Sequence, residues 1–341
     1  MSIFPITKFI NCDVQTDVED KWNDFVDGGN GFLYGIPQNA SRVLQLDLED
    51  KSLKEIGPNL DGENFNYGKG IRAENGSIYC MPGYRTKFFL KITPMEGGDA
   101  KVQILKDKPL PRQAYSMWKA EDSWEAGCLA KDGCIYYMPI SASRILKLDT
   151  SNGDNLSLVE DSELPLCKCA GSVLGGDGCV YGLPYLKSSP VFKFDPAKIL
   201  IMNMGCLAFD FASNHHFRGD VLANDGNVYT ANRFGQVIQL DLATNDVSIF
   251  GSKLFNDDDG CGWGYPVIGA NKCIYFPPYD HDRVLKFNPI TQKISLIGNS
   301  HGNEPWKWVS GVLASDGIIY CVPFNAKHIL QIDSRHINRA E

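Results

Sequence analysis

Hydrophobic and polar positions alternate with a period of two in short segments along the whole chain, a pattern typical of half-buried β-strands. The clearest segment is residues 144–149, Arg-Ile-Leu-Lys-Leu-Asp. Residues 132–139, just upstream, read Asp-Gly-Cys-Ile-Tyr-Tyr-Met-Pro. Asp-Gly is a two-residue hairpin signal, and proline ends a strand because it cannot donate to a central ladder. The unit therefore predicts a small-residue strand A, an Ile-Tyr strand B, an alternating strand C and a weaker strand D.

This unit recurs seven times along the chain. Its anchoring tyrosines lie 45 to 57 residues apart: Tyr34, Tyr79, Tyr136, Tyr181, Tyr229, Tyr275 and Tyr320. Seven copies at such a period, each with several short strands, are the signature of a β-propeller. We predict an all-β fold, a single seven-bladed β-propeller over residues 1–341 with four-stranded antiparallel blades.

Two irregularities in the repeat predict how the ring closes and where it is interrupted. The seventh unit has no strand D after Asp333, whereas residues 6–10, Ile-Thr-Lys-Phe-Ile, resemble the missing strand. Pairing this N-terminal strand with the last blade would close the ring and remove two sheet edges. The longest interval, between the second and third units, predicts an insertion at residues 106–121.

The repeated Asp-Gly-x-Ile-Tyr and Arg-Val-Leu-Lys-Leu-Asp segments resemble the blades of NHL-repeat, YVTN-type, gluconolactonase-like and streptogramin-lyase-like propellers over about residues 21–335. That superfamily includes lactonases, lyases and interaction scaffolds, so the resemblance implies the fold and not one activity. The metal-binding Glu and Asn set of gluconolactonases finds no match here. We transfer no catalytic residue from the lyases, because His328 and His336 alone match their histidine pattern poorly.

The composition of the chain limits which classes of partner and which cellular compartment we expect. The formal net charge of −8 disfavours nucleic acid and anionic membranes, which require a basic field. No window approaches the roughly 20 apolar residues of a membrane span, and the N-terminus lacks the pattern of a signal peptide. We expect a monomeric cytoplasmic protein, although a targeting segment ahead of residue 1 would escape this argument. The eleven cysteines include no Cys-x-x-Cys pair, which favours reduced thiols without a disulfide network.

The position that begins strand A is aromatic in six units: Trp22, Tyr67, Trp124, Phe217, Trp263 and Trp308. The residue before it is a lysine in several units, including Lys168 and Lys307. We favour packing between blades as the role of these rings. The alternative is an aromatic and cationic collar at the channel mouth, suited to a sugar, a phosphorylated metabolite or an aromatic acid.

Blades five and six depart most from the repeat, and a ligand that lacks sevenfold symmetry requires such departures. Candidate acid, base or metal-binding residues are His215, His216, Asp220, Asp280, His281 and Asp282. Further candidate ligand contacts are Phe217, Arg218, Arg233, Tyr265, Tyr279 and Arg283. These loops place the site on the face that carries the D–A and B–C loops. Solvated polar loops without a ligand are the plainer interpretation. We expect Asp280 and Asp282 to raise the pKa of His281.

A second ring of cations begins strand C and includes Arg42, Arg144 and Arg283. We expect these residues to cap turn carbonyls or to pair with the repeated aspartates, such as Asp132 and Asp177.

The sequence is compatible with two functions and does not decide between them. The first is a binding module that recognises a protein partner or a small polar or anionic ligand at the channel mouth. The second is a hydrolase or lyase that acts on a small polar substrate at the same face. We predict no cofactor, and a divalent cation in the channel remains an open alternative.

Overall fold

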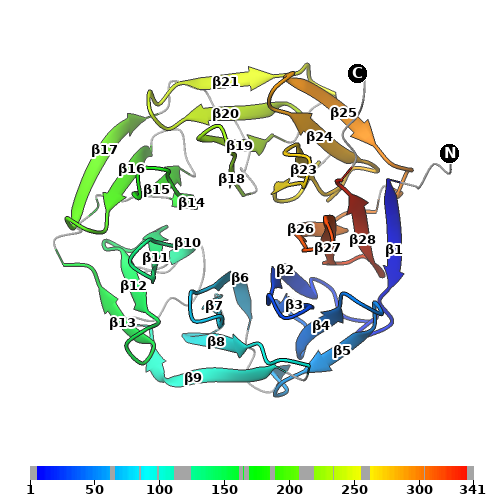
Figure 1. The fold of residues 1–341 in the computed structure, drawn as a ribbon, viewed down its shortest axis with the longest axis horizontal. Coiled ribbons are helices and arrows are strands. Elements are labelled where there is room, and N and C mark those ends of the chain that lie inside the picture. The colour runs from blue at the N-terminus through cyan, green and yellow to red at the C-terminus, as the bar shows by residue number, and fades with distance from the viewer. Residues whose placement is uncertain are drawn as a thin grey trace.

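The computed structural model describes residues 6–61, 66–83, 86–97, 100–110, 124–160, 164, 169–184, 189–206, 219–232, 234–254, 262–302 and 304–335. Seven four-stranded antiparallel sheets stand around one axis as blades, with strand A of each nearest the centre (Figure 1). No helix occurs among these residues. The predicted seven-bladed β-propeller is confirmed.

Each blade uses four strands, which we call A to D from the axis outward. The A strands are β2 (Trp22–Asp27), β6 (Tyr67–Arg72), β10 (Trp124–Leu129), β14 (Cys169–Leu174), β18 (Val221–Leu222), β22 (Val267–Ile268) and β26 (Trp308–Leu313). The B strands are β3 (Phe32–Pro37), β7 (Ile78–Pro82), β11 (Cys134–Pro139), β15 (Val180–Pro184), β19 (Asn227–Ala231), β23 (Ile274–Phe276) and β27 (Ile318–Pro323). The C strands are β4 (Val43–Asp47), β8 (Phe88–Thr93), β12 (Leu146–Asp149), β16 (Pro190–Asp195), β20 (Val237–Asp241), β24 (Val284–Asn288) and β28 (His328–Asp333). The D strands are β5 (Leu53–Ile56), β9 (Lys101–Pro109), β13 (Asn155–Leu158), β17 (Leu200–Cys206), β21 (Val247–Phe250), β25 (Lys293–Ile297) and, for blade seven, β1 (Thr7–Asn11).

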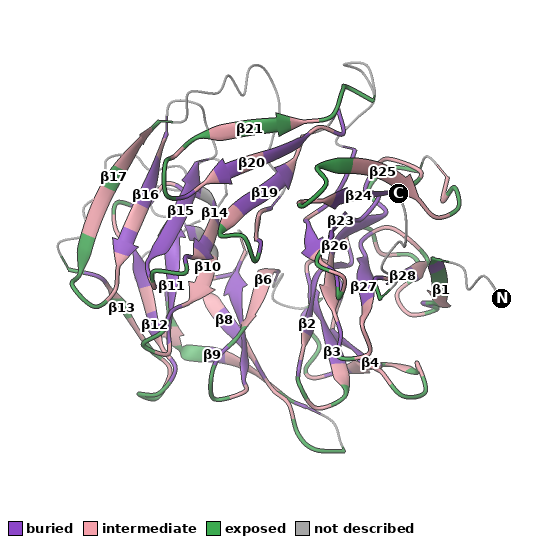
Figure 2. Ribbon diagram, turned by 45° about the horizontal axis from the view of Figure 1, so that its top comes forward, coloured by how far each residue is buried: buried purple, intermediate pink, exposed green. Residues whose placement is uncertain are grey.

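Burial across a blade explains the sequence pattern of its strands. Strand B packs against neighbouring blades on both faces, so every residue of β7, β11 and β15 is buried. Strand D forms the rim: β13 alternates exposed with half-buried residues, and no residue of β17 is buried (Figure 2). Strand B therefore reads as a continuous apolar run, whereas the outer strands keep the alternation of half-exposed sheets.

One hydrogen bond recurs in all seven A–B turns. The hydroxyl of the anchoring tyrosine bonds the Asp or Asn side chain four residues before it. The pairs and distances are Asn30–Tyr34 3.1 Å, Asn75–Tyr79 3.2 Å, Asp132–Tyr136 2.7 Å, Asp177–Tyr181 2.9 Å, Asp225–Tyr229 2.7 Å, Asn271–Tyr275 2.9 Å and Asp316–Tyr320 2.7 Å. In every blade but the first, the Oδ1 atom of the same side chain also accepts the N–H two residues on. The side chain thus fastens the turn to the buried strand B.

The cations that begin strand C do not meet these turn aspartates, so that part of the sequence prediction is wrong. Strand C begins at the B–C loops, at the end of the blade opposite the A–B turns. Arg42 instead donates to the carbonyl of Gly57, which is the capping role, and Arg144 lies 3.8 Å from Glu160.

The N-terminal strand closes the ring as predicted. β1 pairs with β28 in antiparallel register, from Thr7 opposite Ile332 to Asn11 opposite His328. The Phe9 ring stacks on Trp308, with ring centroids 5.9 Å apart, so the contact extends beyond the backbone. The two segments from opposite ends of the chain lie side by side (Figure 1).

Three other expectations meet the structure only in part. The predicted insertion begins inside β9, where Pro109 pairs with Phe88, and residues 111–123 lie outside the described ranges. The described cysteines, nine in number, are all free thiols. Within the described ranges, no helix has the length and apolarity needed to cross a membrane.

The closure predicts a measurable asymmetry between two neighbouring side chains of β1. We expect Phe9→Ala to lower the free energy of unfolding by about 1 kcal/mol, because it removes the stacked ring. Lys8→Ala, the matched control on the other face, should change it by less than about 0.5 kcal/mol. Urea denaturation measures both values, and equal effects would contradict the closure.

The turn network predicts a pH dependence at Asp177. Burial acts to raise the pKa of Asp177, but hydrogen bonds from Lys193, the Cys179 N–H and Tyr181 outweigh it and hold the pKa at about 2. The stabilisation is therefore present above the ordinary aspartate pKa and is lost as the pH falls through about 2.

The test compares Asp177→Asn with the wild type in unfolding experiments. The variant should be less stable at pH 7 by no more than about 1 kcal/mol, because the pair is partly exposed. The difference should vanish near pH 2; a difference that persists there would argue against the ionised carboxylate as its cause.

Candidate functional site

The third residue of each strand A segment, counted from the aromatic position, lies in or just before the innermost strand of its blade. Most of these residues differ from one another: Asp24, Lys69, Ala126, Gly171, Gly219, Tyr265 and Ser310. Asp220 follows at the next position in blade five. Asp24, Lys69, Asp220, Tyr265 and Ser310, which we call the axial cluster, come from blades one, two, five, six and seven.

Asp24 joins three adjacent blades. Its side chain is buried, and its Oδ1 atom lies 2.9 Å from the hydroxyl of buried Ser310 in blade seven. Its Oδ2 atom accepts the backbone N–H of Gly70 in blade two at 3.3 Å. The carboxylate is therefore held between blades seven, one and two.

Lys69 reaches from blade two to a residue of blade six. Its ammonium lies 3.9 Å from the centroid of the Tyr265 ring, a cation–π contact between blades that are not neighbours. The same ammonium opposes the rise in pKa of both Asp24 and Asp220. One lysine thus interacts with both carboxylates and one ring of the axial cluster.

The side chains of Asp220 and Tyr265 each lie against a glycine, at a position where a Cβ atom would clash with them. A Cβ atom added at Gly171 of blade four would lie 1.6 Å from Oδ2 of Asp220. A Cβ atom at Gly219, whose φ is +69°, would lie 2.0 Å from the Tyr265 ring. Asp220 accepts no hydrogen bond from the described part of the chain.

The two carboxyl groups are chemically unusual. Burial raises the pKa of Asp24 to about 6, and the Lys69 ammonium, Ser310 and backbone N–H groups only partly offset this rise. Burial likewise raises the pKa of Asp220 to about 6. Both groups can accept hydrogen bonds at neutral pH and exchange a proton close to it.

The tryptophans of the predicted collar pack between neighbouring blades, each in a cluster with residues of the preceding blade. Each is buried, and its indole N–H donates to the backbone carbonyl that begins strand C of the same blade. The pairs are Trp22–Arg42 3.0 Å, Trp124–Arg144 2.7 Å, Trp263–Arg283 2.9 Å and Trp308–His328 2.8 Å. Tyr67 is buried at the same position. The structure supports the packing interpretation for these five rings.

Lys307 also has a structural contact. It is buried, and its ammonium donates to the Glu304 carbonyl at 2.7 Å. Tyr279 is buried too and packs on Phe324, whereas Arg283 is exposed and lies 3.7 Å from Asp282.

The expected rise in the pKa of His281 is wrong. Its ring stacks on Trp263, with centroids 4.7 Å apart, and its Nδ1 accepts the backbone N–H of Arg283. Burial lowers its pKa, and Asp282 offsets this only in part. Asp280 accepts the N–H of Trp306 at 2.9 Å, so this loop is bound to its neighbour.

Six sequence-predicted residues lie outside the described ranges: Lys168, His215, His216, Phe217, Arg218 and Arg233. Their roles stay predictions. Of the others, the structure brings only Asp220 and Tyr265 together in the axial cluster. The described residues contain no group of three His, Cys, Asp or Glu side chains placed to hold a metal ion.

Sequence reasoning missed Asp24, Lys69 and Ser310, although a signal was present. The position two residues after the aromatic holds small residues in three blades and ionisable or polar ones in the others. Comparing that position across the seven repeats would have identified the axial residues.

Comparison with solved structures places the chain among seven-bladed propellers. A streptogramin B lyase matches at 14% identity and TM-score 0.71, covering 95% of this chain and 96% of that one. Virginiamycin B lyase from Staphylococcus aureus, in an inactive variant with quinupristin, matches at 12% identity and TM-score 0.72 over 96% and 98%. YCF48 bound to a D1 peptide matches at 10% identity and TM-score 0.68 over 99% and 98%.

At these identities the likeness shows the fold alone, and it confirms the resemblance to lyase-type propellers at that level. No protein-family model matches the chain, and comparison with curated proteins gives no match either.

The raised pKa values predict how the two axial carboxyl groups titrate. Their carboxyl carbons should titrate near pH 6 in a carbon-13 NMR experiment, and Asp195, on the rim, should titrate below the ordinary aspartate value because Lys198 pairs with it. Stability from the raised groups is full below the unfolded pKa and is lost as the pH rises through about 6.

The double variant Asp24→Asn, Asp220→Asn should accordingly lose less stability than the wild type between pH 4 and pH 7. Axial carbons that titrate near pH 4 would show that burial does not govern these groups.

Proposed function

We propose that this protein is a binding propeller that takes a small polar ligand at the axial cluster. The observation that carries the proposal is Asp220, a carboxylate inside the ring that accepts no hydrogen bond from the described residues. A group of this kind gains most from a ligand that brings its own donors.

The charges of the axial cluster favour one class of ligand. Two carboxylates face one lysine, and that lysine already interacts with both carboxylates and with the Tyr265 ring. An anion would meet like charge at Asp24 and Asp220. An amine or a polyol would donate to Asp220 and place its carbon atoms against Tyr265.

The position of the cluster suits entry from the face that carries the D–A and B–C loops. Asp24 and Tyr265 lie near the beginning of their strands, which is the end next to those loops.

A second candidate function is a lyase or hydrolase at the same place. The pKa of about 6 at Asp24 and Asp220 lies in the range that suits general acid–base catalysis. The likeness to streptogramin-lyase structures supports this alternative, and quinupristin, named with one of them, serves as a trial substrate.

Thermal-shift titrations at pH 7.5 separate the proposals, with ethanolamine, sorbitol and lactate as probes. We expect ethanolamine or sorbitol to raise the melting temperature of the wild type and lactate to have no effect. Asp220→Asn and Gly171→Ala should each weaken binding at least tenfold. The alanine displaces the carboxylate without changing its charge. Lys131→Met, on an exposed A–B turn, should bind like the wild type.

Equal binding by the wild type and by Asp220→Asn would overturn the axial site. The enzyme alternative predicts turnover of quinupristin, read by mass spectrometry, because hydrolysis adds the mass of one water and an elimination adds none. Turnover that is lost in Asp24→Asn and Asp220→Asn would favour that alternative over pure binding.

A further inference from the structure

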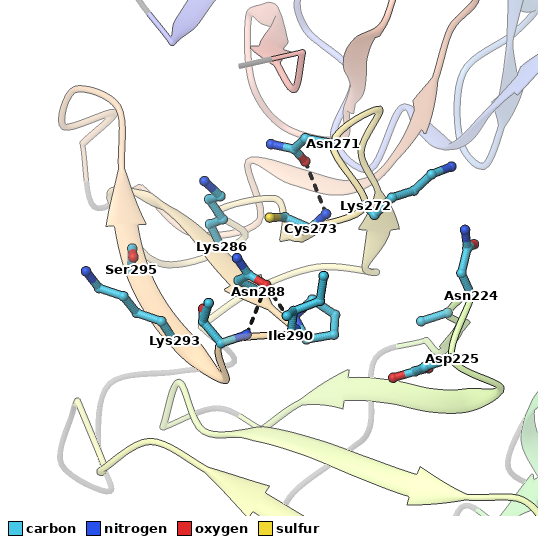
Figure 3. Close-up of a pocket in the computed structure, with 13 residues that line it drawn as sticks. Asn224, Asp225, Asn271, Lys272, Cys273, Lys286, Asn288, Ile290, Lys293 and Ser295 are labelled. Carbon is cyan, nitrogen blue, oxygen red and sulfur yellow. Dashed lines mark hydrogen bonds between the residues drawn. The ribbon is translucent and has the colours of Figure 1, made fainter. Parts of the chain in front are cut away.

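A groove of about 620 Å³ lies between blades five and six, at the end of the ring that carries the A–B turns. It is separate from the axial cluster. Asn224 and Asp225 of blade five line it together with Lys272, Cys273, Lys286 and Lys293 of blade six (Figure 3). Three lysines against one aspartate make this groove basic, although the protein as a whole carries a net charge of −8.

Lys286 occupies a position that every blade repeats, directly opposite the anchoring tyrosine in strand C. The equivalent residues are Gln45, Lys91, Lys147, Lys193, Gln239 and Gln331. In blades two and four this lysine pairs with an aspartate. Lys91 pairs with Asp154 at 2.6 Å, and Lys193 pairs with Asp177 at 2.8 Å. Lys147 lies 5.8 Å from the Tyr136 ring centroid.

The topology explains why Lys286 has no such partner among the described residues. Its own turn residue is the neutral Asn271, whereas Lys193 has Asp177. Asp154, which serves Lys91, comes from the C–D turn of the following blade. Blade seven follows blade six and has no C–D turn, because its outer strand is β1. The aspartate that ends β28, Asp333, pairs with Arg335 at 2.6 Å.

Lys286 is nevertheless buried, with 9% of its surface exposed, and that remaining surface opens into the groove beside Cys273 (Figure 3). A lysine that lines a groove and has no carboxylate partner among the described residues can attract an anion. An anion in the groove would supply the missing charge.

Lys272 gives an independent indication. It follows the turn residue of blade six with a φ of +66°. The six other blades have glycine there, at φ between +78° and +92°: Gly31, Gly76, Gly133, Gly178, Gly226 and Gly317. Left-handed backbone disfavours a residue with a Cβ atom, so blade six places a cation at the groove against the local preference of the chain.

The one acidic residue of the groove is already engaged. Asp225 accepts the Tyr229 hydroxyl at 2.7 Å through Oδ2 and the Asn227 N–H at 3.0 Å through Oδ1. Apolar surface lies alongside, since Ala223 and Pro289 line the groove and Ile290 is 90% exposed at its edge.

We propose that this groove binds a small organic anion. A phosphate or carboxylate group would meet Lys286, with Lys272 as a second cation, and the apolar part of the ligand would rest on Pro289 and Ile290. The site is a second one, on the opposite face from the axial cluster, and does not depend on the function proposed there.

The test uses phenyl phosphate, benzoate and uncharged phenol as probes, with calorimetry as the readout. We expect phenyl phosphate or benzoate to bind and phenol not to bind, and the stronger of the two anions identifies the head group. Lys286→Gln should weaken binding at least tenfold. It should fold normally, because three blades carry glutamine at this position. Lys147→Gln, at the same position of blade three, should bind like the wild type.

A second variant tests whether misfolding, and not the loss of the lysine charge, explains weaker anion binding by Lys286→Gln. Lys272→Gly restores the residue that the other blades use, so we expect it to raise the melting temperature and to weaken anion binding severalfold. Asp220→Asn should leave anion binding unchanged, which separates this site from the axial cluster. Absence of binding by both anions, or equal binding by the wild type and Lys286→Gln, would overturn the proposal.

Discussion

The hydrogen bond between each anchoring tyrosine and the Asp or Asn four residues before it is the contact on which the ring depends. The tyrosine lies in strand B, which is buried on both faces, so its hydroxyl requires a partner. The Asx side chain supplies it and at the same time holds the A–B turn, as Asp132 does for Tyr136 and Cys134. The same hydrogen bond recurs in all seven blades and holds each A–B turn against its strand B. Groups that could bind a ligand occur where the sequence of a blade departs from the repeat.

Both proposed sites arise from such breaks. In the inner strands, the third residue of strand A differs between blades, and Asp24 and Lys69 stand where blades three to five have small residues. At the opposite face, closure by β1 removes the one C–D turn that would have served blade six. Lys286 is then left with its charge toward the groove. Closure of the ring by β1 thus also makes blade six differ from the other blades, at a place where a ligand could bind.

The sequence predicted the fold because the information is local. Period-two alternation, Asp-Gly turns and the spacing of the tyrosines each depend on a few adjacent residues, and residues 6–10 matched a strand missing from the last repeat. The candidate site was harder to predict from the sequence. Asp24 and Asp220 belong to blades one and five, and only the ring brings both under the influence of Lys69. His281 looked like a titrating residue because Asp280 and Asp282 flank it, but stacking on Trp263 and burial determine its chemistry. The tryptophans looked like a collar because sequence does not reveal that their indole N–H groups bond to their own blades.

The central claim is that Asp220, which accepts no hydrogen bond from the described residues, binds a ligand that brings hydrogen-bond donors. A crystal structure of the protein grown with ethanolamine at pH 7.5 tests it most directly. The account predicts electron density for the amine within hydrogen-bond distance of Asp220 and against the Tyr265 ring, with Lys69 still over that ring. Density for water alone at Asp220, or an Asp220 side chain paired with another residue of the chain, would contradict it.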